Sequence, residues 1–174
     1  MDTTLAPRVA ILMGSDSDLP VMAEAAKLLR RMNVGFELHV TSAHRTPERT
    51  VKIIRAAEER GVQVFIAGAG AAAHLAGVVA AHTTRPVLGV PLAASDLNGL
   101  DALLATAQMP AGIPVGTLAI GKAGAANAAW LAMSISAISD PELDAALKLE
   151  RKKMAEKVEA KSDAAQAQLD ELTR

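Results

Sequence analysis

The chain has 174 residues, of which 51% are hydrophobic and 21% are charged, and its formal net charge is −1. This composition predicts a globular protein with a substantial core and excludes an intrinsically disordered chain. The near-neutral charge and the aromatic content of 2% argue against binding to nucleic acid or to an anionic membrane surface. The absence of cysteine excludes disulfides and thiol catalysis, and it suits a cytoplasmic location.

No segment is predicted to target or span a membrane. Residues 1–7 lack the basic segment and apolar core of a signal peptide. The most apolar stretch, residues 118–138, contains Lys122, Asn127 and two glycines. We therefore interpret this stretch as a strand end, a loop and a buried helix, with a transmembrane span as the weaker alternative.

Short apolar runs alternate with helical patterns along the first 140 residues. The runs predict strands at residues 9–13, 36–40, 62–67, 86–90 and 115–120. Helices are predicted over about 19–32, 47–60, 72–82, 100–107 and 123–138. This alternation is typical of βαβ units, so we expect an α/β fold with a parallel sheet and helices on both faces.

A last helix is predicted from Asp140-Pro141-Glu142 to about residue 172. At 1.5 Å per residue it would be about 45 Å long, against about 40 Å for the diameter of a domain of this size. We expect its apolar stripe to pack against another subunit, and the alternative is an alanine-rich tail whose final ten residues fray. The stripe consists of Leu143, Leu147, Met154, Val158, Ala165, Leu169 and Leu172.

The helix over 123–138 is nearly apolar on all sides, so we expect it to be buried all round. One α/β domain covers only one face of an outer helix. The pattern therefore also favours a homo-oligomer.

Three predicted loops bring polar residues to the carboxyl ends of strands. They cover residues 14–18, 41–46 and 68–73. Ligands of open parallel sheets bind at these ends, near the point where the strand order reverses. The candidate ligand-binding residues are Gly14, Ser15, Ser17, Asp18, Ser42, His44, Arg45, Gly68, Gly70 and His74.

These residue types suit a phosphorylated small molecule. Glycines let backbone N–H groups approach an anion, Arg45 can form a fork on a phosphate, and Asp18 can accept a hydrogen bond from a ribose hydroxyl. His44 and His74 can transfer protons. Each residue also has a structural alternative: Asp18 could cap a helix, and His74 could be an ordinary residue of a helix N-terminus.

The residues alone therefore predict proton transfer on a phosphorylated sugar or nucleotide. No spacing of histidines or carboxylates predicts a metal site, and neither a P-loop nor an intact dinucleotide fingerprint is present.

Five motifs carry a resemblance to a known family. They lie in order over about residues 8–140, at 13–18 (Met-Gly-Ser-Asp-Ser-Asp), 42–47 (Ser-Ala-His-Arg-Thr-Pro), 72–75, 108–115 and 119–129. Together they closely resemble the class I, bacterial N5-carboxyaminoimidazole ribonucleotide mutases of purine biosynthesis. The resemblance implies a three-layer, flavodoxin-like sandwich and a cytoplasmic homo-octamer. It also implies a reaction without cofactor or metal, in which a carboxylate moves from the exocyclic nitrogen of the substrate to ring carbon C4.

The resemblance also implies roles for single residues. His44 matches the proton shuttle, and His74 matches a second histidine near the migrating carboxylate. Further positions match the binding site for the nucleotide substrate: Ser15, Asp18, Arg45, Gly14, Ser17, Ser42, Gly68, Gly70 and Ala71.

Two positions depart from the family pattern. Ala71 stands where the family usually has a third glycine, and Ala76 stands where it usually has a proline. Neither change removes an ionisable group, so the expected function is the same.

Three alternatives stay open at this point. The first is the class II relative, which carboxylates aminoimidazole ribonucleotide directly with CO2. The second is a non-catalytic flavodoxin-like module that binds flavin or nucleotide. The third is a phospho-acceptor domain, which normally needs an aspartate at the end of the third strand, where this chain has Ala67-Gly68. In all cases we expect a single domain over residues 1–174, with a core of about 8–140 and the C-terminal helix at about 141–172.

Overall fold

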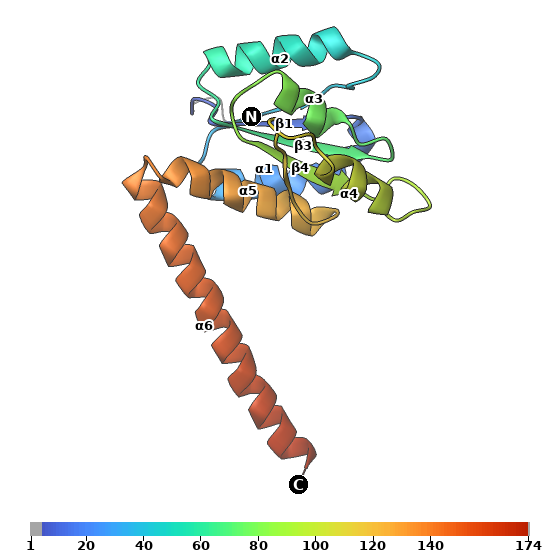
Figure 1. Ribbon diagram of the computed structural model, residues 1–174. Helices are drawn as coiled ribbons and strands as arrows, with labels where there is room; N and C mark the ends of the chain where they lie inside the picture. Colours follow the sequence, from blue (N-terminus) through green and yellow to red (C-terminus); the bar gives the residue numbers. More distant parts are fainter. Residues whose placement is uncertain (1–4, 174) are drawn as a thin grey trace. The chain divides into compact units, whose positions relative to one another are not determined.

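A five-stranded parallel sheet forms the centre of the first part of the chain (Figure 1). The computed structural model describes residues 5–173. Its strands lie in the order β2-β1-β3-β4-β5, and every neighbouring pair is parallel. Flavodoxin-like proteins have this strand order, so the predicted fold class is confirmed. The strands are β1 (Val9–Met13), β2 (Phe36–Val40), β3 (Val64–Gly70), β4 (Val87–Leu92) and β5 (Gly116–Thr117).

Helices cover both faces of this sheet and make three layers. α2 (Pro47–Glu59) and α3 (Leu75–Ala81) lie on one face, and α1 (Leu19–Arg31) and α5 (Lys122–Ala137) lie on the other (Figure 1). A short 3-10 turn, η1 (Asp16–Asp18), precedes α1, and α4 (Leu100–Ala107) connects β4 to β5.

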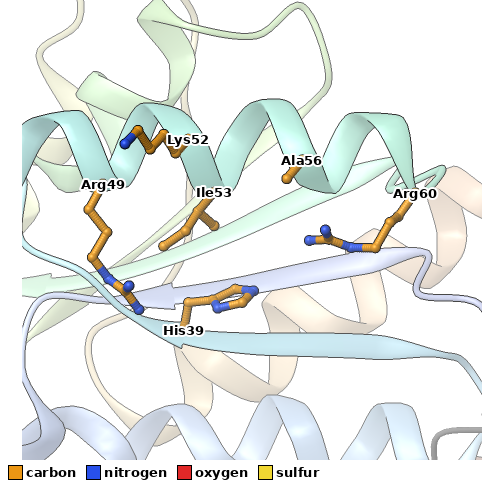
Figure 2. Close-up of a pocket in the computed structure, with 6 residues that line it drawn as sticks. All are labelled: His39, Arg49, Lys52, Ile53, Ala56 and Arg60. Atoms are coloured by element: carbon orange, nitrogen blue, oxygen red, sulfur yellow. The ribbon is translucent and has the colours of Figure 1, made fainter.

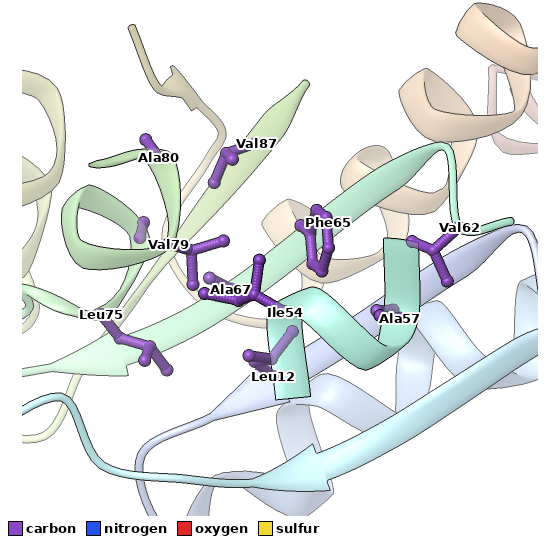
Figure 3. Packing of buried hydrophobic residues seen from close by; sticks show 12 residues of the cluster. Leu12, Ile54, Ala57, Val62, Phe65, Ala67, Leu75, Val79, Ala80 and Val87 are labelled. Carbon is purple, nitrogen blue, oxygen red and sulfur yellow. The ribbon is translucent and has the colours of Figure 1, made fainter. Parts of the chain in front are cut away.

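The core lies between the central strands and the helices. All five residues of β1 are at most 1% exposed, because β1 is covered on both faces. A cluster of buried apolar side chains joins the sheet to α2 and α3, with Phe65 fully buried at its centre (Figure 3). Its strand and helix residues include Leu12, Ala67, Ile54, Ala57, Leu75 and Val79.

The third strand ends later than the sequence predicts. β3 runs to Gly70, and the predicted loop residues Gly68 and Gly70 pair in register with Val90 and Leu92 of β4. The predicted strand 62–67 was therefore wrong at both ends. Glycines weaken the strand pattern in a sequence, but here pairing with β4 makes Gly68 and Gly70 part of the strand. The following helix accordingly begins at Leu75.

The fourth and fifth strands also differ from their predicted ranges. β4 extends to Leu92, two residues beyond the prediction, and β5 contains only Gly116 and Thr117 instead of 115–120. The backbone beyond β5 still follows β4, because Leu118 N–H donates to Gly89 at 2.9 Å and Gly121 N–H donates to Pro91 at 2.9 Å.

Helix α5 is buried on one face only. Ala125, Ala129 and Met133 are fully buried, whereas Leu131 is 40% exposed. The single chain covers one face of this helix, as expected of one domain, and burial of the other face stays a prediction. The exposed face is the one that the sequence assigns to a subunit contact.

The chain divides into two compact units, Met1–Ser136 and Ala137–Arg174. The second unit is mostly one helix, α6 (Pro141–Leu172), whose bounds match the prediction. The Asp140 side chain accepts a hydrogen bond from Leu143 N–H at 3.0 Å, and Pro141 occupies the first turn. Its 32 residues give a length of about 48 Å. The single-domain organisation stays a prediction.

Within residues 5–173, no helix is both long enough and apolar enough to cross a membrane.

Candidate active site

A cavity of about 380 Å³ opens at the carboxyl ends of β1, β2 and β3. The chain leaves β1 toward β2 on one side and returns to β3 on the other side, so this is the point where the strand order reverses. The lining residues are Gly14, Ser15, Ser17, Asp18, Ser42, Ala43, His44, Arg45, Ala69, Gly70, Ala71, Ala72, Leu75 and Ala94.

The loop after β1 is held by a capping box. Ser15 N–H donates to Asp18 Oδ2 at 3.0 Å, and the Ser15 hydroxyl accepts from Ser17 N–H at 3.3 Å. Ser17 Oγ also donates to Ser15 Oγ at 2.9 Å. Both serine hydroxyls are thus placed at the mouth of the cavity.

Asp18 does not cap α1 with its side chain, contrary to one of the two roles considered for it. It occupies the position before Leu19 but makes no side-chain cap bond, since its carboxylate turns back to Ser15. Burial raises the pKa of Asp18, and nearby Asp16 raises it further, while hydrogen bonds from the backbone of Ser15 and Gly14 oppose that rise. A half-buried carboxylate at a cavity wall is suited to accept hydrogen bonds from a ligand.

The loop after β2 is fixed by its own side chains. Ser42 Oγ accepts from His44 N–H at 3.3 Å and from Arg45 N–H at 3.1 Å. Thr46 Oγ1 accepts from Ser42 N–H at 3.0 Å and donates to the Ser42 carbonyl at 3.1 Å. These bonds order the backbone that carries the imidazole and the guanidinium.

A buried pair of threonines anchors the same loop to α2. Thr41 and Thr50 are at most 2% exposed, and their hydroxyls are 2.8 Å apart. Thr50 Oγ1 also donates to the Thr46 carbonyl at 3.2 Å. The strand end and the helix start are therefore joined directly beneath the loop.

Arg45 extends across the cavity to the loop after β1. Its Nη2 donates to the Gly14 carbonyl at 3.2 Å. One guanidinium edge is thereby held, and an Arg side chain has five N–H donors, so others stay available for an anion.

His44 and His74 are in direct contact. His44 Nε2 lies 2.8 Å from His74 Nδ1, and the rings meet edge to face at 88°. One of the two nitrogens carries the hydrogen and the other accepts it, so each ring sets the tautomer of its partner. Both rings are exposed, which leaves His44 open to the cavity that it lines.

The end of β3 brings small residues to the cavity. Gly70 packs so closely that an added Cβ would lie 2.4 Å from Ala94 Cβ. Ala71 follows with φ of +50°, a left-handed conformation that side chains rarely adopt. Gly68 does not line the cavity; an added Cβ there would lie 2.3 Å from Met22 Sδ in α1.

The predicted site residues therefore fall into two groups. The cavity is lined by all of them except Gly68, which packs against α1, and His74, which reaches the cavity only through His44. The residues that sequence reasoning missed are Ala43, Ala69, Ala72, Leu75 and Ala94. Ala94 follows β4, so its place at the carboxyl edge of the sheet was the signal that could have found it.

Across residues 5–173, no group of three or more histidines, cysteines or carboxylates is placed to hold a metal ion. What the arrangement offers is an anion fork, hydrogen-bond donors and acceptors, and a pair of imidazoles.

The fold and this cavity together define a flavodoxin-like α/β protein whose candidate site is lined by groups that suit an anion and proton transfer. Comparison with known proteins then gives the family. The family model described as AIR carboxylase matches residues 8–157, and the chain belongs to this family.

Relatives and solved structures agree with this assignment. The N5-carboxyaminoimidazole ribonucleotide mutase of Pyrococcus abyssi is 58% identical over 148 residues, covering 85% of this chain and 84% of the relative. The mutase of Mycobacterium tuberculosis is 49% identical, covering 97% and 95%. A crystal structure of Treponema denticola PurE matches with a TM-score of 0.80 at 27% identity, covering 87% of this chain and 94% of that chain.

Proposed function

We propose that this protein converts N5-carboxyaminoimidazole ribonucleotide to 4-carboxy-5-aminoimidazole ribonucleotide in purine biosynthesis. Relatives of 49–58% identity are mutases of this name and align over most of the chain. The observation that carries the proposal is that His44 and Arg45, adjacent in one loop, both line the cavity at the switch point of a flavodoxin-like sheet.

The reaction can be written with His44 as the only proton carrier. The bond between the exocyclic nitrogen and the carboxylate carbon breaks and releases CO2, and the nitrogen takes a proton from His44. Carbon C4 then forms a bond to the CO2 and becomes tetrahedral. The neutral His44 removes the C4 proton, which restores the aromatic ring and returns the histidine to its starting state. Atoms and charge balance, and no oxidant or cofactor takes part.

His74 is proposed to orient His44. The 2.8 Å contact between His44 Nε2 and His74 Nδ1 fixes which nitrogen of His44 carries its proton. A substrate carboxylate near His74 would also be stabilised by this imidazole pair.

The remaining polar residues are proposed to bind the nucleotide. Arg45 and the Ser42 hydroxyl suit the phosphate, and Asp18 suits a ribose hydroxyl. Ser15 and Ser17 present hydroxyls from the loop after β1. The backbone at Gly14, Gly70 and Ala71 is proposed to contact the substrate, whereas Gly68 supports the site by letting α1 pack closely.

The alanine-rich wall has a role in this scheme. Ala43, Ala69, Ala72 and Ala94 line the cavity beside the polar groups. Free CO2 must stay in the site until C4 recaptures it, and a small apolar wall that excludes water favours recapture over escape.

We further propose a cytoplasmic homo-octamer. Large apolar side chains are exposed on the single chain, among them Leu97 at 61%, Leu100 at 52% and Val158 at 67%. Such residues are typical of subunit interfaces. Light scattering is expected to return eight times the chain mass of 18.0 kDa, and a stable monomer would contradict the proposal.

Direct carboxylation of aminoimidazole ribonucleotide and non-catalytic binding are not favoured, since the compared relatives are mutases. The test is to follow conversion of N5-carboxyaminoimidazole ribonucleotide by the purified protein without ATP or added metal. We expect turnover. A protein that is inactive on N5-carboxyaminoimidazole ribonucleotide but carboxylates aminoimidazole ribonucleotide with CO2 would have the class II activity. If neither compound reacts, the non-catalytic binding module is the remaining function.

A further inference from the structure

A second concave site lies between β2 and α2, the two elements that the loop carrying His44 connects. It is a groove of about 490 Å³, and it shares no lining residue with the cavity described above. Its lining residues are His39, Arg49, Lys52, Ile53, Ala56 and Arg60 (Figure 2). A groove of this volume is in the usual range for small-molecule sites.

The groove is strongly cationic. Three of its six lining residues carry a positive charge, and none carries a negative charge. At about 100° of rotation per residue, Glu58 lies on the opposite side of α2 from Arg49. The other two acidic residues of this helix, Glu48 and Glu59, lie nearer to Lys52.

The carboxylate of Glu37, which lies two residues before His39 on the same face of β2, is already paired. Glu37 of β2 accepts two hydrogen bonds from Arg60, at 3.0 Å and 2.9 Å. It also lies 3.1 Å from His39 Nε2, which is buried and completes no hydrogen bond. Glu37 thus holds Arg60 in place and offsets its charge.

Two cations of the groove have no acidic partner. Among residues 5–173, no carboxylate pairs with Arg49 or Lys52. Arg49 Nε only reaches the Val40 carbonyl, at 3.5 Å. In Figure 2 Arg49 and Arg60 extend from α2 toward β2 on either side of His39, and Ile53 points from the same helix into the space between them, whereas Lys52 does not extend toward β2.

We propose that this groove binds a small molecule that carries a phosphate group. A phosphate dianion beside Arg49 would balance its charge, and its oxygens would accept charge-assisted hydrogen bonds from the Arg49 fork. Lys52, three residues further along the same helix, would add to the positive charge around it. Because the chain as a whole is nearly neutral, attraction of an anion to this groove would come from its local excess of positive charge.

The test measures phosphate binding with the first site disabled. The parent protein carries Arg45→Gln, and two different double substitutions are added to it. Equilibrium dialysis with labelled inorganic phosphate at low salt then compares phosphate binding by each variant with that of the parent. One is Arg49→Gln with Lys52→Gln in the groove. The other is Arg55→Gln with Lys27→Gln, which removes the same charge from exposed positions of α2 and α1 outside it.

The groove variant is expected to bind phosphate at least about tenfold more weakly, since each lost bond to a charged group weakens binding by about this factor. The control variant is expected to bind as its parent does. Equal losses in both variants would show a general charge effect and overturn the proposal, as would unchanged binding in the groove variant. Because the comparison is made within one background, failure of the mutase assignment leaves this result intact.

A footprint on the unmodified protein checks the position. Phosphate is expected to protect Lys52 from acetylation and to leave Lys27 reactive, as measured by mass spectrometry. The same footprint is then measured with ribose 5-phosphate and with inorganic phosphate. The compound that protects Lys52 at the lower concentration shows whether the groove prefers a sugar phosphate or the free ion. Equal protection by citrate would overturn the assignment to phosphate.

Discussion

Ala71 holds a backbone conformation that glycine adopts without strain, so Ala71→Gly is expected to stabilise the protein. Ala71 has φ of +50° and an exposed side chain. The left-handed conformation destabilises the fold by about 1–2 kcal/mol when the residue has a Cβ. Glycine removes this strain but lowers the folding stability by about 0.4–1 kcal/mol, because it gives the unfolded chain more conformational entropy. Since the exposed methyl contributes little packing, a net gain of about 0.5–1 kcal/mol follows.

The matched control is the next residue. Ala72 is also exposed but does not have a positive φ, so Ala72→Gly is expected to destabilise by about 0.4–1 kcal/mol. Urea unfolding of both variants measures the difference between their free energies of unfolding. The protein concentration is kept the same, because subunit association shifts the apparent stability. We expect the two variants to differ by about 1–2 kcal/mol. Equal destabilisation by both would refute the strain argument.

Three further outcomes follow from the site and its supports. His74→Phe keeps a ring but loses the bond to His44 Nε2, so kcat is expected to fall by more than KM rises, and steady-state kinetics showing an effect on KM alone would contradict the positioning role. The hydrogen bond from Ser95, at 2.6 Å, lowers the pKa of Asp101. This bond therefore contributes its full stability at pH values above the ordinary pKa of an aspartate, and that stability is lost as the pH falls through the lowered pKa of Asp101. Denaturation of Ser95→Ala across pH is therefore expected to show a stability deficit that closes on acidification, and a deficit independent of pH would contradict it. Gly70→Ala is expected to cost about 1–3 kcal/mol through overpacking against Ala94, and an unchanged unfolding midpoint would show that the loop moves aside freely.

Elements defined by local pattern could be predicted from the sequence. The continuous apolar run of β1 and the cap and proline that begin α6 gave bounds that match the structure. Both signals are local: an apolar run fixes a strand covered on two faces, and a cap followed by proline fixes a helix start.

Elements decided by partners in space could not be predicted in this way. Gly68 and Gly70 have loop-forming composition, and only their pairing with β4 makes them strand. β5 is short although its sequence is apolar, because only Gly116 and Thr117 pair with β4. Strand propensity is a weak guide where neighbouring strands supply the stabilisation.

The site shows the same division. The sequence placed His44 in a loop and His74 at the start of a helix at the same edge of the sheet, but the 2.8 Å contact between them depends on how α3 begins after β3. Ala94 carries no chemical group that draws attention in the sequence, yet it lines the cavity. Residue chemistry can be recognised from sequence, whereas the walls of a cavity depend on packing.

Turnover of N5-carboxyaminoimidazole ribonucleotide by His44→Asn, measured beside the wild type, tests the central claim most directly. Asparagine keeps a polar side chain of similar size but cannot carry a proton between nitrogen and carbon. The account predicts that kcat/KM falls by at least about 100-fold, the usual minimum contribution of a positioned acid–base group, while the variant still binds the nucleotide. A variant with unimpaired turnover would show that another group moves the C4 proton and that the loop of residues 41–46 is not the catalytic centre.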